Sequence, residues 1–219
     1  MSNDLSAFAP IPDHPSIWSA QKGTLRSTAL RLRDGSLCLY SPVLGLGEEA
    51  KASLATLGEV GYLLAPNHYH HKGLNEYANA FPKAKIVCSD NARPRLEKQT
   101  GLTFAGLERL KILLPDGCDI AEPTGLKTGE IWLVLSSKQG RLWIVCDSFK
   151  GPKGKVGHIG RAVEMLGTFP TYGIKDKVAY AAWLRDRSAA DEPSMIIPCH
   201  GSMVRSERLA MDVVSLLAS

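Results

Sequence analysis

Three of the six histidines fall within four residues, in the run Pro66-Asn67-His68-Tyr69-His70-His71-Lys72-Gly73. Neutral imidazole is the commonest metal ligand among side chains, whereas a histidine in a protein core usually occurs singly. The cluster therefore indicates a metal site. An exposed turn, or a hydrogen-bonded group without a metal, is the simpler alternative.

Three apolar segments each end in side chains that can bind a metal. Tyr62-Leu63-Leu64-Ala65 precedes the histidine run, and Pro66 should end this strand because it lacks an amide donor and favours extended backbone before it. Residues 141–146 lead to Asp147, and residues 194–199 lead to His200. Open α/β sheets bind ligands at the carboxyl ends of their strands, so we expect these side chains to converge. Histidines with a carboxylate suit zinc, iron or manganese.

The order and spacing of these residues resemble the metallo-β-lactamase superfamily of metal-dependent hydrolases. That family has a His-x-His-x-Asp-His-x-Gly loop, a later Gly-His-Thr-x-Gly motif, an aspartate that ends a strand, and a final Pro-Gly-His-Gly. With Gly73 as the anchor, the loop positions that bear metal ligands in the family are filled here by Pro66, His68, His70 and His71. The later positions are filled by Leu126 within 124–129, by Asp147, and by His200 within Pro198-Cys199-His200-Gly201.

The resemblance covers residues 16–205 and implies an α/β fold, an αββα sandwich of two mixed β-sheets flanked by helices. It also implies one metal instead of two. The first metal of the family would lose two of its three ligands, at Pro66 and Leu126. The second keeps a complete set, namely His70, His71, Asp147 and His200. His68 would lie beside this metal as a hydrogen-bonding neighbour, a proton shuttle or a substitute ligand.

The resemblance implies a metal-dependent hydrolase that uses one divalent transition metal (zinc, iron or manganese) to activate water. The metal would lower the pKa of its water towards neutrality, and Asp147 would bind the metal and orient the water. His68 would act as a general acid or base. The small-molecule substrate would be an ester, lactone, thioester or phosphodiester. A degenerate metal- or ligand-binding protein and an iron-dependent redox protein are the alternatives.

Composition favours one soluble domain over residues 1–219, with residues 1–15 an irregular N-terminal segment. The hydrophobic share is 44% and the charged share is 22%, which are ordinary values for a globular protein. The 26 basic residues are scattered, so we expect no specific nucleic acid partner. Five dispersed cysteines indicate a reducing compartment. Without a signal peptide or a long apolar stretch, we expect a cytoplasmic protein that does not enter a membrane.

Periodicity and turn signals predict the elements that position the ligands. A hairpin is expected within 25–43, because Asp34-Gly35 lies between alternating apolar residues. Helices are expected at 48–57, 74–80, 91–100, 176–187 and 205–217, and further strands at 62–65, 84–88, 112–114, 131–136, 142–146 and 194–199. The strands at 131–136 and 142–146 should pair through Lys138-Gln139-Gly140.

Other chemically suggestive residues have simpler interpretations. The glycine-rich segment 149–161 lacks the glycine and the Ser or Thr of a phosphate-binding loop, and it is interpreted as a mobile surface loop beside the site. His14 and His158 are not expected to bind the metal. Cys146 and Cys199 flank two ligands, but packing as small hydrophobic side chains is favoured over a role as thiolate ligands. The four tryptophans are expected in the core.

Overall fold

The computed structural model describes residues 4–137 and 140–217. The chain divides into two compact units, Met1–Asp116 and Gly117–Ser219, called here the N-terminal and C-terminal units. Met1 to Asn3 and the predicted turn residues Lys138 and Gln139 lie outside the described residues. The single domain over 1–219 stays a prediction.

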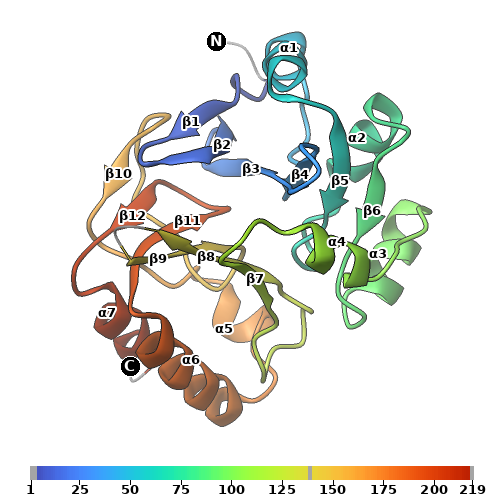
Figure 1. Ribbon diagram of the computed structural model, residues 1–219. Coiled ribbons are helices and arrows are strands. Elements are labelled where there is room, and N and C mark those ends of the chain that lie inside the picture. Colours follow the sequence, from blue (N-terminus) through green and yellow to red (C-terminus); the bar gives the residue numbers. More distant parts are fainter. Residues whose placement is uncertain (1–3, 138–139, 218–219) are drawn as a thin grey trace. The chain divides into compact units, whose positions relative to one another are not determined.

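The described residues of the N-terminal unit form a mixed sheet with strand order β1-β2-β3-β4-β5-β6 (Figure 1). Strands β1 to β4 pair antiparallel, and β4, β5 and β6 pair parallel. The strands are β1 (Ala9–Ile11), β2 (His14–Lys22), β3 (Leu25–Arg31), β4 (Leu37–Tyr40), β5 (Val60–Leu64) and β6 (Lys85–Val87). The predicted hairpin is thus β3 and β4. Residues 1–15 are not wholly irregular, because β1 and the start of β2 lie there and pair with each other.

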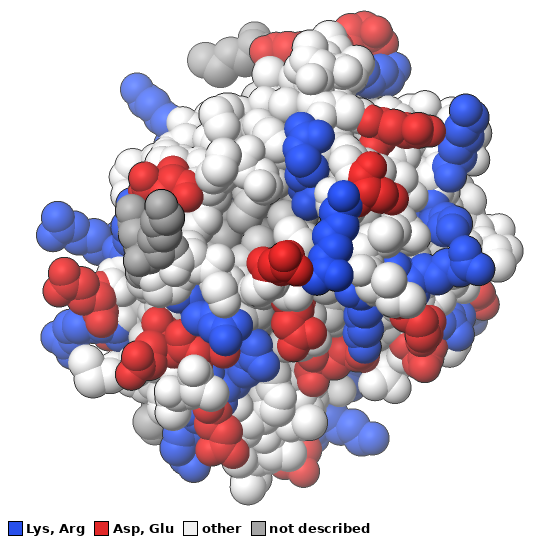
Figure 2. Space-filling model, in the orientation of Figure 1, with Lys and Arg blue, Asp and Glu red and all other residues white. Residues whose placement is uncertain are grey.

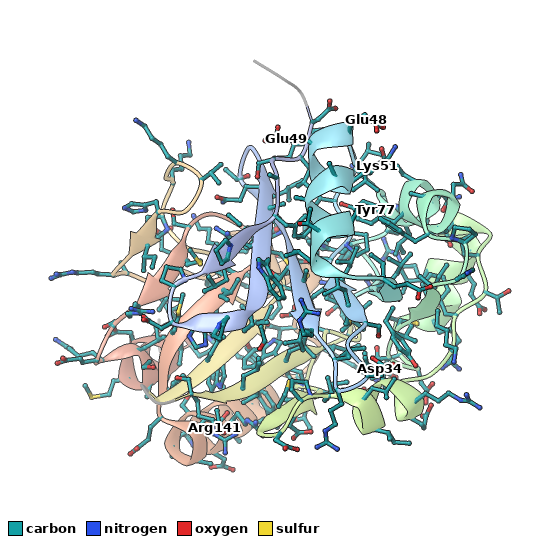
Figure 3. The ribbon with its side chains drawn as sticks, turned by 45° about the horizontal axis from the view of Figure 1, so that its top comes forward. Asp34, Glu48, Glu49, Lys51, Tyr77 and Arg141 are labelled. Atoms are coloured by element: carbon teal, nitrogen blue, oxygen red, sulfur yellow. The ribbon has the colours of Figure 1, made fainter. Side chains whose placement is uncertain are left out.

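Four helices accompany this sheet within the described residues: α1 (Glu48–Leu57), α2 (Leu74–Ala80), α3 (Arg93–Thr100) and α4 (Glu108–Leu113). Glu48 and Glu49 lie in the first turn of α1 (Figure 3), where carboxylates complement the helix dipole. The buried face of α1 places Ala50 and Leu54 in one hydrophobic cluster with Leu39, Leu63 and Tyr77. The helix ends at Gly58, whose φ of 146° suits glycine.

The strand predicted at 112–114 is wrong, because α4 covers Glu108–Leu113. Leu107, Leu110 and Leu114 are buried at the spacing of one helical face, whereas the apolar Ile112 is 71% exposed. Glu108 in the first turn and Lys111 in the last also suit the helix dipole. A run of three apolar residues is too short to distinguish strand from helix by periodicity.

The described residues of the C-terminal unit form a second six-stranded mixed sheet, in the order β10-β12-β11-β9-β8-β7 (Figure 1). Its strands are β7 (Cys118–Ala121), β8 (Trp132–Ser137), β9 (Gly140–Val145), β10 (Ile159–Gly160), β11 (Pro193–Pro198) and β12 (Met203–Arg205). Strand β9 pairs antiparallel with β8 and parallel with β11. The strands predicted at 131–136, 142–146 and 194–199 are confirmed, whereas β7, β10 and β12 were not predicted.

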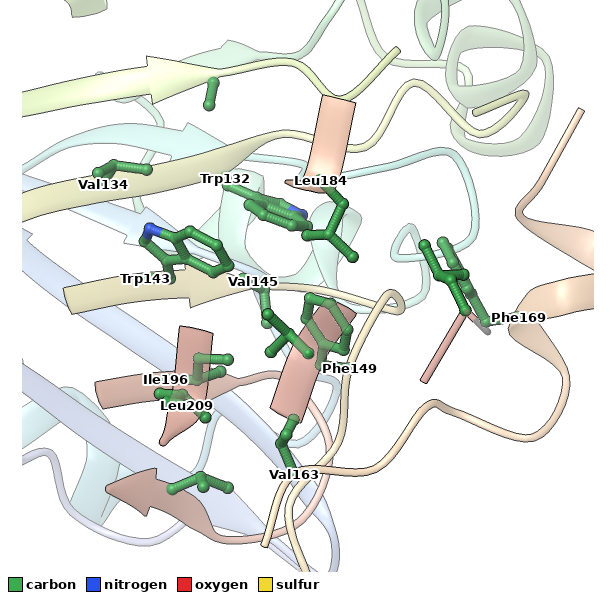
Figure 4. Close-up of a cluster of buried hydrophobic side chains, with 14 of the residues drawn as sticks. Trp132, Val134, Trp143, Val145, Phe149, Val163, Phe169, Leu184, Ile196 and Leu209 are labelled. Carbon is green, nitrogen blue, oxygen red and sulfur yellow. The ribbon is translucent and has the colours of Figure 1, made fainter. Parts of the chain in front are cut away.

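The helices α5 (Phe169–Tyr172), α6 (Lys177–Asp191) and α7 (Leu209–Ser215) belong to this unit. The predicted terminal helix begins later than residue 205, because β12 occupies Met203–Arg205. Trp132 packs against Trp143 with ring centroids 5.0 Å apart, and both indoles lie in a buried cluster with Phe149, Leu184 and Ile196 (Figure 4). These tryptophans therefore build the core, as predicted.

No helix in the described part of the chain has both the length and the apolar character required to cross a membrane. Basic and acidic side chains are interspersed over the face shown in Figure 2. This mixture agrees with the scattered charges of the sequence.

Candidate metal centre

The histidine run forms a compact turn after β5, and Asn67 holds it. Asn67 is fully buried, and its Oδ1 accepts hydrogen bonds from the amides of Tyr69 and His70, at 2.8 and 3.1 Å. Such side-chain bonds to the following amides are typical of asparagine turns. At the other end of the run, a side chain at Gly73 would overlap the carbonyl oxygen of Pro42. The turn thus needs the residue types that the sequence places at both ends.

Hydrogen bonds orient two of the predicted ligands in this turn. The Nδ1 of His71 lies 3.3 Å from the carbonyl oxygen of His68. A carbonyl only accepts, so Nδ1 carries the proton and Nε2 carries the lone pair that a metal requires. The Nδ1 of His70 lies 2.8 Å from the Ser41 hydroxyl at the end of β4. Both contacts are of the kind that fixes the ring of a metal-binding histidine.

His68 has a different environment, because it is 7% exposed and contacts Arg95 of α3. The Nη1 of Arg95 lies 3.2 Å from the Nε2 of His68, and the guanidinium stacks over the Tyr69 ring at 4.4 Å. Arginine has no acceptor, so it donates to Nε2, and the neutral ring of His68 carries its proton on Nδ1. While this bond persists, Nε2 of His68 neither binds a metal nor accepts another proton.

In the C-terminal unit, parallel pairing of β9 and β11 brings Asp147 and His200 together, because Pro198 is in register with Val145. The Nε2 of His200 lies 2.9 Å from Oδ1 of Asp147, and the two side chains are 20% and 11% exposed. Two ligand atoms about 2.1 Å from one metal and at right angles would lie about 3.0 Å apart. Without a metal this contact is a hydrogen bond from Nε2 to Oδ1, because a carboxylate oxygen only accepts. The same two atoms have the chemistry and the separation of adjacent metal ligands, and a metal would replace the proton between them.

Glu130, which the sequence analysis missed, lies buried beside this pair. Its carboxylate accepts hydrogen bonds from the amides of Cys146, Asp147 and Ser148, at 3.2, 3.1 and 3.2 Å. The Trp132 indole also donates to it, at 2.8 Å. Burial, followed by the negative charge of Asp147, raises the pKa of Glu130 to about 7. The only sequence signal was a charged residue directly before the apolar strand predicted at 131–136.

The segment after Phe149 is fastened to the turn that contains His200. The Gly151 amide donates to the His200 carbonyl at 3.0 Å, and the Ser202 amide donates to the Pro152 carbonyl at 2.9 Å. The Nδ1 of His158 lies 3.0 Å from the Ser202 hydroxyl, which supports a structural role for this histidine. The motion expected of residues 149–161 stays a prediction.

Cys146 and Cys199 are both buried. Burial raises the pKa of the Cys146 thiol well above its usual value. Burial of both thiols is what packing as small hydrophobic side chains requires.

The structure thus brings together two groups of predicted site residues. One is the turn that carries His68, His70 and His71 in the N-terminal unit, and the other is the pair of Asp147 and His200 in the C-terminal unit. That both groups share one metal stays a prediction.

Comparisons with known proteins identify the fold. No protein-family model matches the chain, and no curated protein sequence matches it. A metal-soaked flavodiiron core from Synechocystis sp. PCC6803 matches at a TM-score of 0.63 and 13% identity. The match covers 100% of the present chain and 62% of the flavodiiron core. A metallo-β-lactamase from Pontibacter korlensis matches at 0.61 and 12% identity, over 99% of this chain and 100% of its own length.

The DIM-1 metallo-β-lactamase matches at a TM-score of 0.64 and 10% identity, with 98% of this chain and 99% of that protein covered. The predicted fold class is confirmed, because the described residues form two mixed six-stranded sheets flanked by helices. The chain therefore has the metallo-β-lactamase fold.

Proposed function

We propose that this protein is a metal-dependent hydrolase that binds one divalent transition metal through His70, His71, Asp147 and His200. The observation that carries the proposal is the 2.9 Å approach of His200 to Asp147 at the ends of two parallel strands. This pair lies in a chain with the metallo-β-lactamase fold, which supports the proposal that both side chains bind one metal.

The chain's own residues would prepare this site. When bound, such a metal would polarise a substrate oxygen and lower the pKa of water. The His68 carbonyl orients His71, and the Ser41 hydroxyl holds His70. We propose that His68 does not bind the metal, because Arg95 donates to its Nε2. Proton transfer by His68 would require Arg95 to move first.

One metal is proposed instead of two because of Pro66 and Leu126. Pro66 has no side-chain donor, and Leu126 packs against the hydrophobic cluster of the C-terminal unit. Neither residue can take the place of an imidazole. The proposed substrates are small esters, lactones, thioesters or phosphodiesters.

The same two replacements support a second candidate, a protein that binds a metal or ligand without hydrolysis. Iron belongs among the metals to be tested, because a flavodiiron core is among the similar structures. The two candidates differ in turnover at full metal occupancy, so one experiment separates them.

The experiment is a reconstitution series with zinc, iron and manganese. Each form is analysed for metal content and assayed on ester, lactone, thioester and phosphodiester substrates. We expect about one metal per chain, and turnover with at least one of the metals. Asp147→Ala should lose metal and turnover, whereas His14→Ala, outside the proposed site, should keep both.

A full complement of metal without turnover of any substrate would favour the second candidate, the binding protein. No metal retention in any of the three forms would refute the metal-dependent hydrolase and the metal-binding form of the second candidate.

A further inference from the structure

The Glu130 carboxylate lies at the end of β9 and accepts hydrogen bonds from the amides that follow this strand. β9 ends at Val145, and the next three amides, those of residues 146 to 148, donate to Glu130. Glu130 is 2% exposed, and a fourth donor, the Trp132 indole, fixes it from β8. Leaving even one buried amide without an acceptor destabilises a protein. The Glu130 carboxylate therefore has a structural task, because it accepts from four buried donors.

We propose that Glu130 is a positioning residue that sets the backbone turn of residues 146–148 and thereby aims the Asp147 carboxylate at His200. This inference rests on the proposed function insofar as Asp147 binds a metal. Its structural half, the fixing of the Asp147 backbone, does not depend on a metal.

The two carboxylate oxygens of Glu130 have different tasks. Oε1 accepts from Trp132 and from the amides of Cys146 and Ser148. Oε2 accepts from the Asp147 amide, at 3.1 Å. In Glu130→Gln, the side-chain oxygen of glutamine keeps the three hydrogen bonds of Oε1 if it takes the place of that atom. The amide nitrogen then takes the place of Oε2, where it faces the Asp147 N–H as a second donor.

Glu130→Gln therefore disturbs the hydrogen bond of the proposed ligand and preserves the others. Neighbouring groups that hold a ligand in place typically contribute 10- to 100-fold in metal affinity. We expect a folded variant whose Co²⁺ affinity is at least about tenfold lower, with altered visible absorption of the bound Co²⁺. Glu130→Asp, which is too short to reach all four donors, should also weaken binding.

Trp132→Phe is the matched control. It removes one donor to Glu130 and perturbs the core, but it leaves the three amide bonds in place. We expect it to lower thermal stability while Co²⁺ affinity stays within about twofold of the wild-type value. A role for Glu130 in stability alone would give the same affinity in all three variants.

A second measurement uses the metal-free protein. In amide NMR spectra, Glu130→Gln should shift the Asp147 signal and speed its hydrogen exchange more than those of Cys146 and Ser148. This pattern supports the positioning role even if the wild-type chain binds no metal, a result that would refute only the proposed function.

Unchanged Co²⁺ affinity in a folded Glu130→Gln chain would overturn the inference, as would an Asp147 amide signal that does not move. If Glu130→Gln does not fold, Glu130→Asp takes its place under the same criteria. If neither folds, Trp132→Phe decides, because a loss of Co²⁺ affinity beyond twofold with the three amide bonds kept would overturn the inference.

Discussion

Asn67 offers a direct test of how the histidine turn is held. Asn67→Ala removes the Oδ1 acceptor of the Tyr69 and His70 amides, whose bonds are 2.8 and 3.1 Å long. Each such bond contributes about 1 kcal/mol net, so the free energy of unfolding should fall by about 2 kcal/mol. In a chain of this length, that loss corresponds to a melting temperature lower by about 4–8 °C.

The same substitution should weaken metal binding. If the turn is lost in the metal-free variant, binding must rebuild it at a cost of about 2 kcal/mol, which is roughly a 30-fold loss of affinity. The assay is urea unfolding of the metal-free chain together with titration of Co²⁺ or Zn²⁺.

Asn75→Ala is the control for Asn67→Ala. Asn75 is an exposed asparagine of the same unit that donates to the Thr100 carbonyl at 3.1 Å. This change should alter stability by less than about 0.5 kcal/mol. The reasoning would be refuted if Asn67→Ala behaved like Asn75→Ala in both assays.

Three further predictions concern the C-terminal unit. Gly151→Ala should lower the melting temperature and weaken metal binding, because the added Cβ would overlap the Ser202 carbonyl. Gly157→Ala is the control, because a Cβ at Gly157 meets no neighbouring atom. It should lower the melting temperature and the metal affinity less than Gly151→Ala does. Because the raised pKa of Glu130 lies near 7, against 4.5 for an ordinary glutamate, its contribution to metal-free stability should be complete below about pH 4.5 and lost as the pH rises to about 7. The difference in unfolding free energy between wild-type and Glu130→Gln chains, measured from pH 4 to 8, should follow that course, and a difference that rises with pH would contradict it. Trp143→Phe removes a 2.8 Å bond to the buried Asp191 and should destabilise the chain by about 1–3 kcal/mol in urea, with metal affinity unchanged.

The elements that the sequence predicted well have strong local signals. Asp34-Gly35 marked the β3–β4 hairpin, a glycine directly follows each of the helices predicted at 48–57 and 91–100, and Pro66 marked the end of β5. Each of these signals acts through backbone preferences of one or two residues, so it is readable without knowledge of the fold. The three strands that lead to the predicted ligands were found from another local signal, their runs of apolar residues.

The elements that were missed lack such signals. The three-residue strand β12 exists because β10 and β11 pair with it, and nothing in Met203-Val204-Arg205 separates it from the start of a helix. In the same way, α4 was mistaken for a strand because its apolar run is short. Pairing with β10 and β11 decides the first case, and the spacing of buried residues over several turns decides the second.

The candidate site shows the same division. Residue types at three strand ends indicated the histidine run, Asp147 and His200, and the resemblance to the metallo-β-lactamase superfamily selected His70 and His71 from that run. Only the tertiary structure showed that Arg95 occupies Nε2 of His68 and that Glu130 gathers the amides around Asp147. Arg95 and His68 are separated by 27 positions and Glu130 and Asp147 by 17, and contacts over such separations depend on how helices and strands pack. The sequence thus determined which groups could bind a metal, whereas the fold decided which neighbours orient them.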